Sequence, residues 1–244
     1  MRCIGIDLAV RPDRTGVAVI DWRPDGGGVA TVRTGTDDAE ILDLLTDDAT
    51  DVVGLDVPLG WPDRFVDAVR AHADRRPLPD LDWGDAYAEL RLRVTDRWLR
   101  TRCGANPMSV STNLIAAPAL RAAWLLARAE QHGVVVDRSG RTGRVVEVYP
   151  GAALRVWGLP FSGYKSGPQA QRTQGRIRAA VLDAMGLELV GDVRNDHELD
   201  ALLCAVIARL SRIRATRPVP EQHSEVAERE GWIHVPLGPL DELP

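Results

Sequence analysis

The stretch Arg2-Cys-Ile-Gly-Ile-Asp-Leu8 predicts a buried strand with an aspartate near its end. Because the side chains of a strand alternate between its two faces, one face carries Ile4, Ile6 and Leu8, and the other carries Cys3 and Gly5 followed by Asp7. A carboxylate in this place lies at the edge where α/β sheets commonly bind their ligands. The stretch therefore predicts an α/β sheet with Asp7 at its functional edge.

Apolar runs and turn residues further along the chain extend this sheet and add helices. We expect further strands at 15–22, 29–33, 51–57, 134–136 and 144–148, the first two continuing the opening strand as a meander, and a short edge element at 231–236. Apolar periodicity predicts helices at 37–45, 64–73, 85–100, 112–130, 169–185 and 196–213. No flexible linker is evident, so we interpret the chain as a single domain, 1–244, with a helical insertion at about 61–130.

The composition limits the class of protein. With 244 residues and 45% hydrophobic residues, the chain can build a substantial core. A net charge of −5 argues against a protein that coats nucleic acid through bulk electrostatics, but not against an enzyme with a local metal site. No run approaches the roughly 18–20 apolar residues of a membrane span, and no signal-peptide pattern precedes the first strand, so we expect a cytoplasmic protein without a membrane partner. The three cysteines are far apart and imply neither a disulfide framework nor a zinc site.

The strand expected at 51–57 repeats the pattern of the first strand. Asp56 lies near its C-terminal end, and Gly54 precedes it by two residues on the same face. A glycine at this place leaves space beside the carboxylate, as Gly5 does beside Asp7. The repeated pattern predicts an open acidic site above the ends of the two strands.

A third carboxylate, Glu147, stands between valines in an apolar strand that Pro150 ends. Burying a carboxylate in such a strand is costly unless the carboxylate is paired, hydrogen-bonded or bound to metal. The alternative is an edge-strand glutamate that faces water. The strand alone leaves both interpretations open.

Two further aspartates lie on the helix expected at 196–213. Asp196 belongs to the run Asn195-Asp-His-Glu198, which resembles a capping box, so one interpretation is a first-turn acid that favours the helix dipole. Asp200 lies one turn further on, on the shoulder of the apolar stripe, where a half-buried acid requires a cation. For His197 a solvated first-turn side chain is favoured over a catalytic base.

Carboxylates from separate strand ends and one helix are typical of sites for divalent cations. Such a set can hold two ions about 3.5–4 Å apart, which activate a water molecule and stabilise the leaving oxygen when a phosphodiester is cleaved. Oxygen ligands favour Mg²⁺ or Mn²⁺ over zinc. The predicted metal ligands are Asp7, Asp56, Glu147, Asp196 and Asp200, and the predicted catalytic residues are Asp7, Asp56, Glu147 and Asp200.

Short motifs from one end of the chain to the other carry a family resemblance. In order they are Gly5-Ile-Asp-Leu-Ala9, Leu55-Asp-Val-Pro-Leu-Gly60, Arg93-Val-Thr-Asp-Arg97, Ser109-Val-Ser111, Glu147-Val-Tyr-Pro150, Tyr164-Lys165, Asp196 through Leu199-Asp-Ala-Leu-Leu-Cys-Ala205, and Glu230-Gly-Trp-Ile233. As an ordered set they resemble the DUF429 family, predicted nucleases of the ribonuclease H-like superfamily.

The resemblance implies a ribonuclease H-like α/β fold, with a five-stranded mixed sheet, the first three strands antiparallel, and helices on both faces. It also implies that Asp7 is the central metal ligand. Asp56 then lies at the end of the fourth strand, and either Asp200 or Asp196 contributes from the C-terminal helix. Glu147 is the candidate for a further glutamate found in resolvase-like relatives.

Basic and hydroxyl side chains near these motifs are candidates for substrate binding. Arg93 and Arg97 lie one turn apart on an expected helix, and guanidinium groups bind phosphate in bidentate fashion. Ser109, Ser111 and Lys165 lie in expected loops, where serines donate hydrogen bonds to phosphate and a lysine senses its charge. The alternatives are a solvated helix face or a brace for the acidic site, turn-forming serines and a surface lysine.

Three functions compete. The first is a metal-dependent nuclease or phosphodiesterase that acts on nucleic acid or another phosphoester. The second is a nucleotide-binding ATPase or kinase-like protein of the same superfamily, but its second phosphate loop and glycine-rich adenosine motif are not found in the sequence. The third is a non-catalytic metal-binding module, against which the intact carboxylates weigh.

Overall fold

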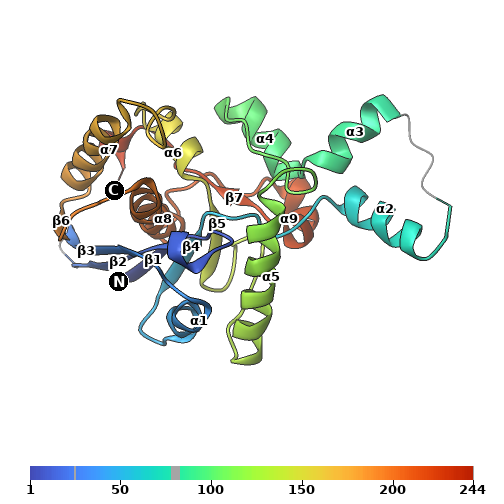
Figure 1. Ribbon diagram of the computed structural model, residues 1–244, viewed down its shortest axis with the longest axis horizontal. Coiled ribbons are helices and arrows are strands. Elements are labelled where there is room, and N and C mark those ends of the chain that lie inside the picture. Colours follow the sequence, from blue (N-terminus) through green and yellow to red (C-terminus); the bar gives the residue numbers. More distant parts are fainter. Residues whose placement is uncertain (25, 78–82, 244) are drawn as a thin grey trace.

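The computed structural model describes residues 1–24, 26–77 and 83–243. Within them a seven-stranded mixed sheet is covered by helices on both faces (Figure 1), so the α/β class is confirmed. In sheet order the strands are β6 Leu187–Val190, β3 Gly28–Thr34, β2 Gly16–Trp22, β1 Arg2–Asp7, β4 Val52–Leu55, β5 Val145–Val148 and β7 Ile233–His234.

Strands β1, β2 and β3 form the expected antiparallel meander, and the other strands join it in parallel. The expected number of five strands is wrong, because β6 and β7 add one strand at each edge. They have 4 and 2 residues, too few for their periodicity to distinguish them from loops. β7 lies within the edge element expected at 231–236. The strand expected at 134–136 is reduced to a single bridge between Val136 and Gly143.

The expected helices are found, with one of them interrupted, and α6 Pro150–Val156 and α9 Ser224–Glu230 are helices that were not expected. The helix expected at 85–100 is wrong, because the chain breaks it at Arg93. Arg93 has an extended backbone, and Asp96 accepts a hydrogen bond from its amide at 3.0 Å, which starts a new helix. No helix in the described ranges is both long and apolar enough to span a membrane. The helices are α1 Asp38–Thr46, α2 Asp63–Ala73, α3 Trp83–Arg91, α4 Val94–Cys103, α5 Ala116–Gln131, α6 Pro150–Val156, α7 Ala170–Ala184, α8 Asp196–Arg212 and α9 Ser224–Glu230.

The helices cover the sheet in two layers (Figure 1). On one face α8 is buried along nearly its whole length, with α6 and α7 packed beside it. On the other face α5 contributes Ala119, Ala122 and Leu125 to a core that it shares with α1. By contrast, α2 and α3 project away from the sheet (Figure 1). The segment expected as an insertion at about 61–130 thus combines a core helix with projecting ones.

Two glycines let α8 lie directly against the centre of the sheet. A Cβ atom at Gly5 would lie 2.0 Å from the carbonyl oxygen of Ala201, and one at Gly54 would lie 2.6 Å from that of Cys204. Any larger residue would push the helix away. The space that these glycines were expected to leave open is therefore filled by α8, whose N-terminal turns reach the strand ends.

Candidate metal centre at the strand ends

Three carboxylates from distant parts of the sequence meet where β1 and β4 end. Asp7 is the last residue of β1, Asp56 follows β4, and Asp200 lies in the second turn of α8. Each offers one oxygen, and these three oxygens lie within 4.8 Å of one another. Parallel pairing of the two strands sets the first two carboxylates side by side, since the Asp56 amide donates to the carbonyl of Ile6 at 2.9 Å.

Asp200 is fully buried, and two residues from the loop before α7 contact it. The Tyr164 hydroxyl donates to its Oδ1 at 2.9 Å, and the Lys165 ammonium lies 2.6 Å from its Oδ2. Burial raises the pKa of Asp200 to about 6, although Lys165 opposes the rise. Lys165 supplies one positive charge. When all three carboxylates are ionised, the cluster therefore keeps an excess of negative charge.

Asp7 and Asp56 are half-buried. Burial raises the pKa of Asp56 well above its usual value, against the opposing effect of Lys165. Asp7 Oδ2 lies 2.6 Å from His197 Nδ1, and this hydrogen bond raises the pKa of His197. His197 was expected to be a solvated first-turn side chain; its contact with Asp7 was not predictable, because the two residues lie 190 positions apart and no local pattern connects them.

Glu147 lies near this cluster but outside the group of three. Its two oxygens accept hydrogen bonds from Arg93 at 2.7 and 2.6 Å, and Oε2 also accepts one from the backbone amide of Leu59 at 2.9 Å. Glu147 and Arg93 are each 2% exposed. Of the interpretations that the sequence left open, the structure shows a paired and hydrogen-bonded glutamate. That it also binds metal stays a prediction.

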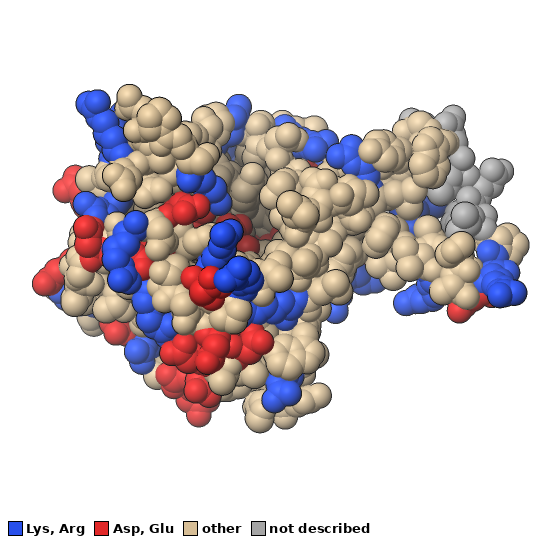
Figure 2. All heavy atoms as spheres, viewed as in Figure 1, with Lys and Arg blue, Asp and Glu red and all other residues tan. Residues whose placement is uncertain are grey.

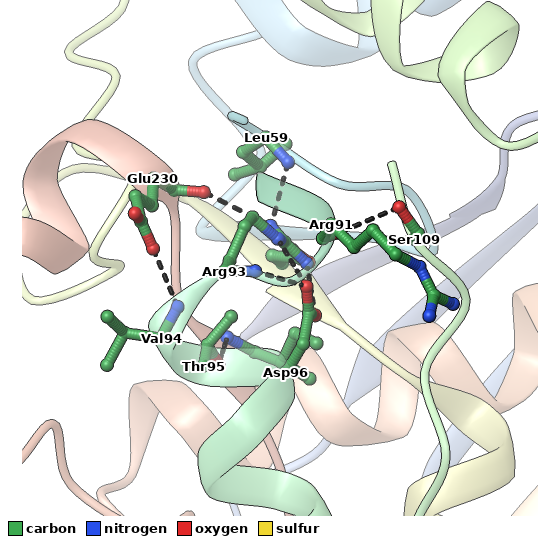
Figure 3. Close-up of polar contacts among 10 residues, drawn as sticks. Leu59, Arg91, Arg93, Val94, Thr95, Asp96, Ser109 and Glu230 are labelled. Carbon is green, nitrogen blue, oxygen red and sulfur yellow. Dashed lines mark hydrogen bonds and ion pairs between the residues drawn. The ribbon is translucent and has the colours of Figure 1, made fainter. Parts of the chain in front are cut away.

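The guanidinium of Arg93 is surrounded by acceptors (Figure 3). Besides Glu147, it donates to Asp96 at 3.2 and 3.0 Å and to the carbonyl of Glu230 at 3.2 Å. The carboxylate of Glu230 in turn accepts from the amide of Val94 at 2.6 Å. Arg93 therefore joins β5, α4 and the end of α9, and the geometry favours bracing over contact with a substrate.

The other predicted site residues lie outside the cluster. The Arg97 side chain is 39% exposed and lies 3.5 Å from a glutamate of α3. Ser109 donates to the carbonyl of Arg91 at 2.6 Å and so stabilises the loop before α5. The Ser111 hydroxyl is buried and has no hydrogen-bond partner among the residues that the structure describes. Asp196 opens α8 and is half-buried, but it does not belong to the group of three.

The acidic cluster forms part of the wall of a pocket of about 550 Å³. On the face shown in Figure 2, a hollow lies between the part of the molecule formed by α6 and α7 and the part formed by α4 and α5. Basic and acidic side chains are interspersed over the same face rather than gathered into one basic patch (Figure 2). The wall of the pocket includes the charged residues Asp7, Asp56, Arg93, Asp96, Glu147 and Lys165, and also Tyr149, Tyr164, Met108 and Phe161.

Fold and site together define an α/β protein with a carboxylate cluster at the ends of parallel strands in a mixed sheet. The chain belongs to the family described as "Protein of unknown function (DUF429)", which matches residues 5–225 and confirms the resemblance carried by the motifs. No curated protein matches the chain. Among solved structures it is similar to the Thermus thermophilus RuvC structure, with 15% sequence identity, a TM-score of 0.42, and coverage of 90% of this chain and 100% of that chain.

Proposed function

We propose that this protein is a metal-dependent hydrolase that cleaves a phosphodiester, in nucleic acid or in another phosphoester, with Mg²⁺ or Mn²⁺ held by Asp7, Asp56 and Asp200. The observation that carries the proposal is the approach of these three carboxylate oxygens to within 4.8 Å of one another at the ligand-binding edge of the sheet. The central strand order β3-β2-β1-β4-β5 supports the ribonuclease H-like fold that the motifs imply.

The donor set fits a hard divalent cation. All three candidate ligands are carboxylates, which Mg²⁺ and Mn²⁺ prefer. Asp200 is fully buried, and an ionised carboxylate buried beside two others is costly without a cation. Arg93 donates to both oxygens of Glu147, so we propose that Glu147 positions the site in this arrangement; its predicted role as a metal ligand would require it to exchange Arg93 for the ion.

When bound, the ion supplies Lewis-acid chemistry, because it activates a water molecule and stabilises charge that develops on the phosphate. The protein's own residues orient the ligands: Tyr164 binds Asp200 at 2.9 Å, and His197 binds Asp7 at 2.6 Å. Lys165, whose side chain is 54% exposed, is the cation in contact with the cluster that can turn toward a substrate phosphate.

Calorimetric titration of Mn²⁺ tests the metal site. The wild-type protein is compared with Asp7→Asn and with Asp67→Asn, an exposed carboxylate on α2 that serves as the matched control. We expect Mn²⁺ binding to be lost in Asp7→Asn and kept in Asp67→Asn, with both variants folded by circular dichroism. Equal binding by Asp7→Asn and wild type would overturn the proposed site.

Cleavage is tested separately on DNA, RNA and a small aromatic phosphodiester in Mg²⁺ and in Mn²⁺. We expect hydrolysis of at least one of them by the wild-type protein and none by Asp7→Asn. Metal binding without any hydrolysis would instead support the non-catalytic metal-binding module.

A further inference from the structure

Phe161 lines the same pocket as Asp7 and Asp56 of the acidic cluster. It belongs to the loop between α6 and α7, and it is 46% exposed. A single exposed apolar side chain is ordinary in a folded protein and needs no explanation. What distinguishes Phe161 is that it shares a pocket with Asp7 and Asp56 and that its ring is supported.

The ring of Phe161 is held in position from one side. The guanidinium carbon of Arg155, on α6, lies 4.6 Å from the ring centroid, which is a cation–π contact. Arg155 in turn packs on Gly104, the left-handed residue that ends α4 with φ of 62°. A Cβ atom at Gly104 would lie 3.0 Å from a terminal nitrogen of Arg155, so the glycine makes room for the guanidinium. Two helices thus support the aromatic ring before any ligand arrives.

The wall of this pocket is largely apolar, although charged side chains also belong to it. It includes Pro107, Met108 and Ile115, together with the ring of Tyr149. A phosphate group is charged and strongly hydrated, so it gains nothing from such a wall. The volume of about 550 Å³ lies within the range of pockets that bind small organic molecules. This chemistry suits a flat aromatic group linked to the phosphodiester, and in nucleic acid that group is the base, which is linked through the sugar and has two π-faces.

We propose that the pocket binds one unpaired nucleobase of the substrate, stacked on Phe161, while the adjoining phosphodiester lies at Asp7, Asp56 and Asp200. The inference rests on the proposed function and narrows its substrate class to single-stranded nucleic acid. A base in a duplex is stacked and paired, and reaching this pocket would require its extrusion at a cost of a few kcal/mol. Stacking on an aromatic side chain accepts any base, because every base has a π-face.

The test measures binding by fluorescence anisotropy in Ca²⁺ with three labelled probes of roughly 12 nucleotides, a length that single-strand binding proteins cover. The probes are oligothymidylate, the same backbone with abasic residues, and a duplex of equal length. The abasic strand keeps the phosphates and removes the bases. We expect the affinity of the wild-type protein for oligothymidylate to exceed its affinity for either other probe by at least about tenfold, since one stacked base is worth about that factor.

Three variants locate the contact. Phe161→Ala should bind oligothymidylate about tenfold more weakly and so approach the affinity for the abasic strand. Phe161→Trp keeps a stacking surface and should retain binding. Trp124→Ala is the matched control, because Trp124 is 48% exposed and carries the guanidinium of Arg128 at 5.0 Å, yet lies on α5 outside the pocket. Its binding should equal that of the wild type.

Equal affinity for the abasic strand or the duplex overturns the inference, as does full binding by Phe161→Ala or no binding of oligothymidylate at all. The outcome is separable from that of the proposed function. Base-dependent binding through Phe161 without cleavage in Mg²⁺ or Mn²⁺ would remove the hydrolase and keep the base pocket. Equal cleavage of normal and abasic strands would keep the hydrolase and remove the base pocket.

Discussion

Replacing Arg93 by methionine removes the cation that two buried carboxylates share. Glu147 and Asp96, at 2% and 0% exposure, lose two hydrogen bonds each, and methionine fills much of the volume without supplying a donor. Removing one partner of a buried ion pair costs about 3–5 kcal/mol, because an uncompensated charge stays behind. We expect Arg93→Met to lower the free energy of unfolding by about that amount near neutral pH.

The loss should shrink as the pH falls. Burial already raises the pKa of Glu147, and Arg93 opposes that rise. Without Arg93 the pKa rises further, so the folded variant binds a proton at a pH where the unfolded chain does not. Each unit of difference in pKa is worth about 1.4 kcal/mol. The deficit is therefore largest at high pH and decreases as the pH falls toward the unfolded value near 4.5.

Urea unfolding between about pH 8 and pH 5 measures both effects. Arg97→Met, in the first turn of the helix that Arg93 precedes, is the control, since its side chain is 39% exposed and its ion pair is weak, and it should change stability by less than about 1 kcal/mol. The reasoning is refuted if the two variants lose similar amounts, or if the loss in Arg93→Met does not vary with pH.

Three further perturbations test other parts of the structure. Gly5→Ala should lower the Tm steeply or prevent folding, because its Cβ would lie 2.0 Å from a backbone oxygen of α8; Gly175→Ala, with nothing within 4 Å, should not. Lys165→Met should tighten Mn²⁺ binding by about tenfold or more in calorimetry, because it removes a positive charge 2.6 Å from Asp200; weaker binding would contradict this. Burial lowers the pKa of His234 below its usual value of 6.5. The stability that the neutral imidazole contributes is therefore lost as the pH falls below that value. In His234→Gln, the Tm should fall less steeply between about pH 7 and pH 5 than in the wild type. An equally steep fall would refute the view that protonation of His234 destabilises the protein.

The convergence of Asp7 and Asp56 was predictable because it depends on local pattern. Each aspartate comes at the end of an apolar strand, and parallel pairing of such strands brings their C-terminal ends together. Asp200 stood out because it follows the apolar stripe of a helix closely enough to be buried. Periodicity therefore included these three carboxylates among the five predicted ligands, but it did not separate Asp200 from Asp196, and it gave the wrong reason for the glycines beside the strand-end aspartates.

The contacts that surround the cluster were not predictable in this way. Arg93 and Glu147 are separated by 54 positions, and their pairing depends on how α4 docks beside β5. The same docking fixes Asp96 under Arg93 and breaks a segment that has the composition of a continuous helix. Phe161 lies in an irregular loop, where no period tells which side chains face a pocket.

The position of α8 has a consequence for the order in which the chain is made. Strands β1, β2 and β4 are synthesised early, yet one apolar face of the sheet stays uncovered until residues 196–212 emerge and dock. A nascent or truncated chain that stops short of α8 exposes that face, and such surfaces are prone to aggregation. It also lacks the third carboxylate. The acidic centre is thus completed only near the end of synthesis, and shortened fragments of the protein cannot carry it.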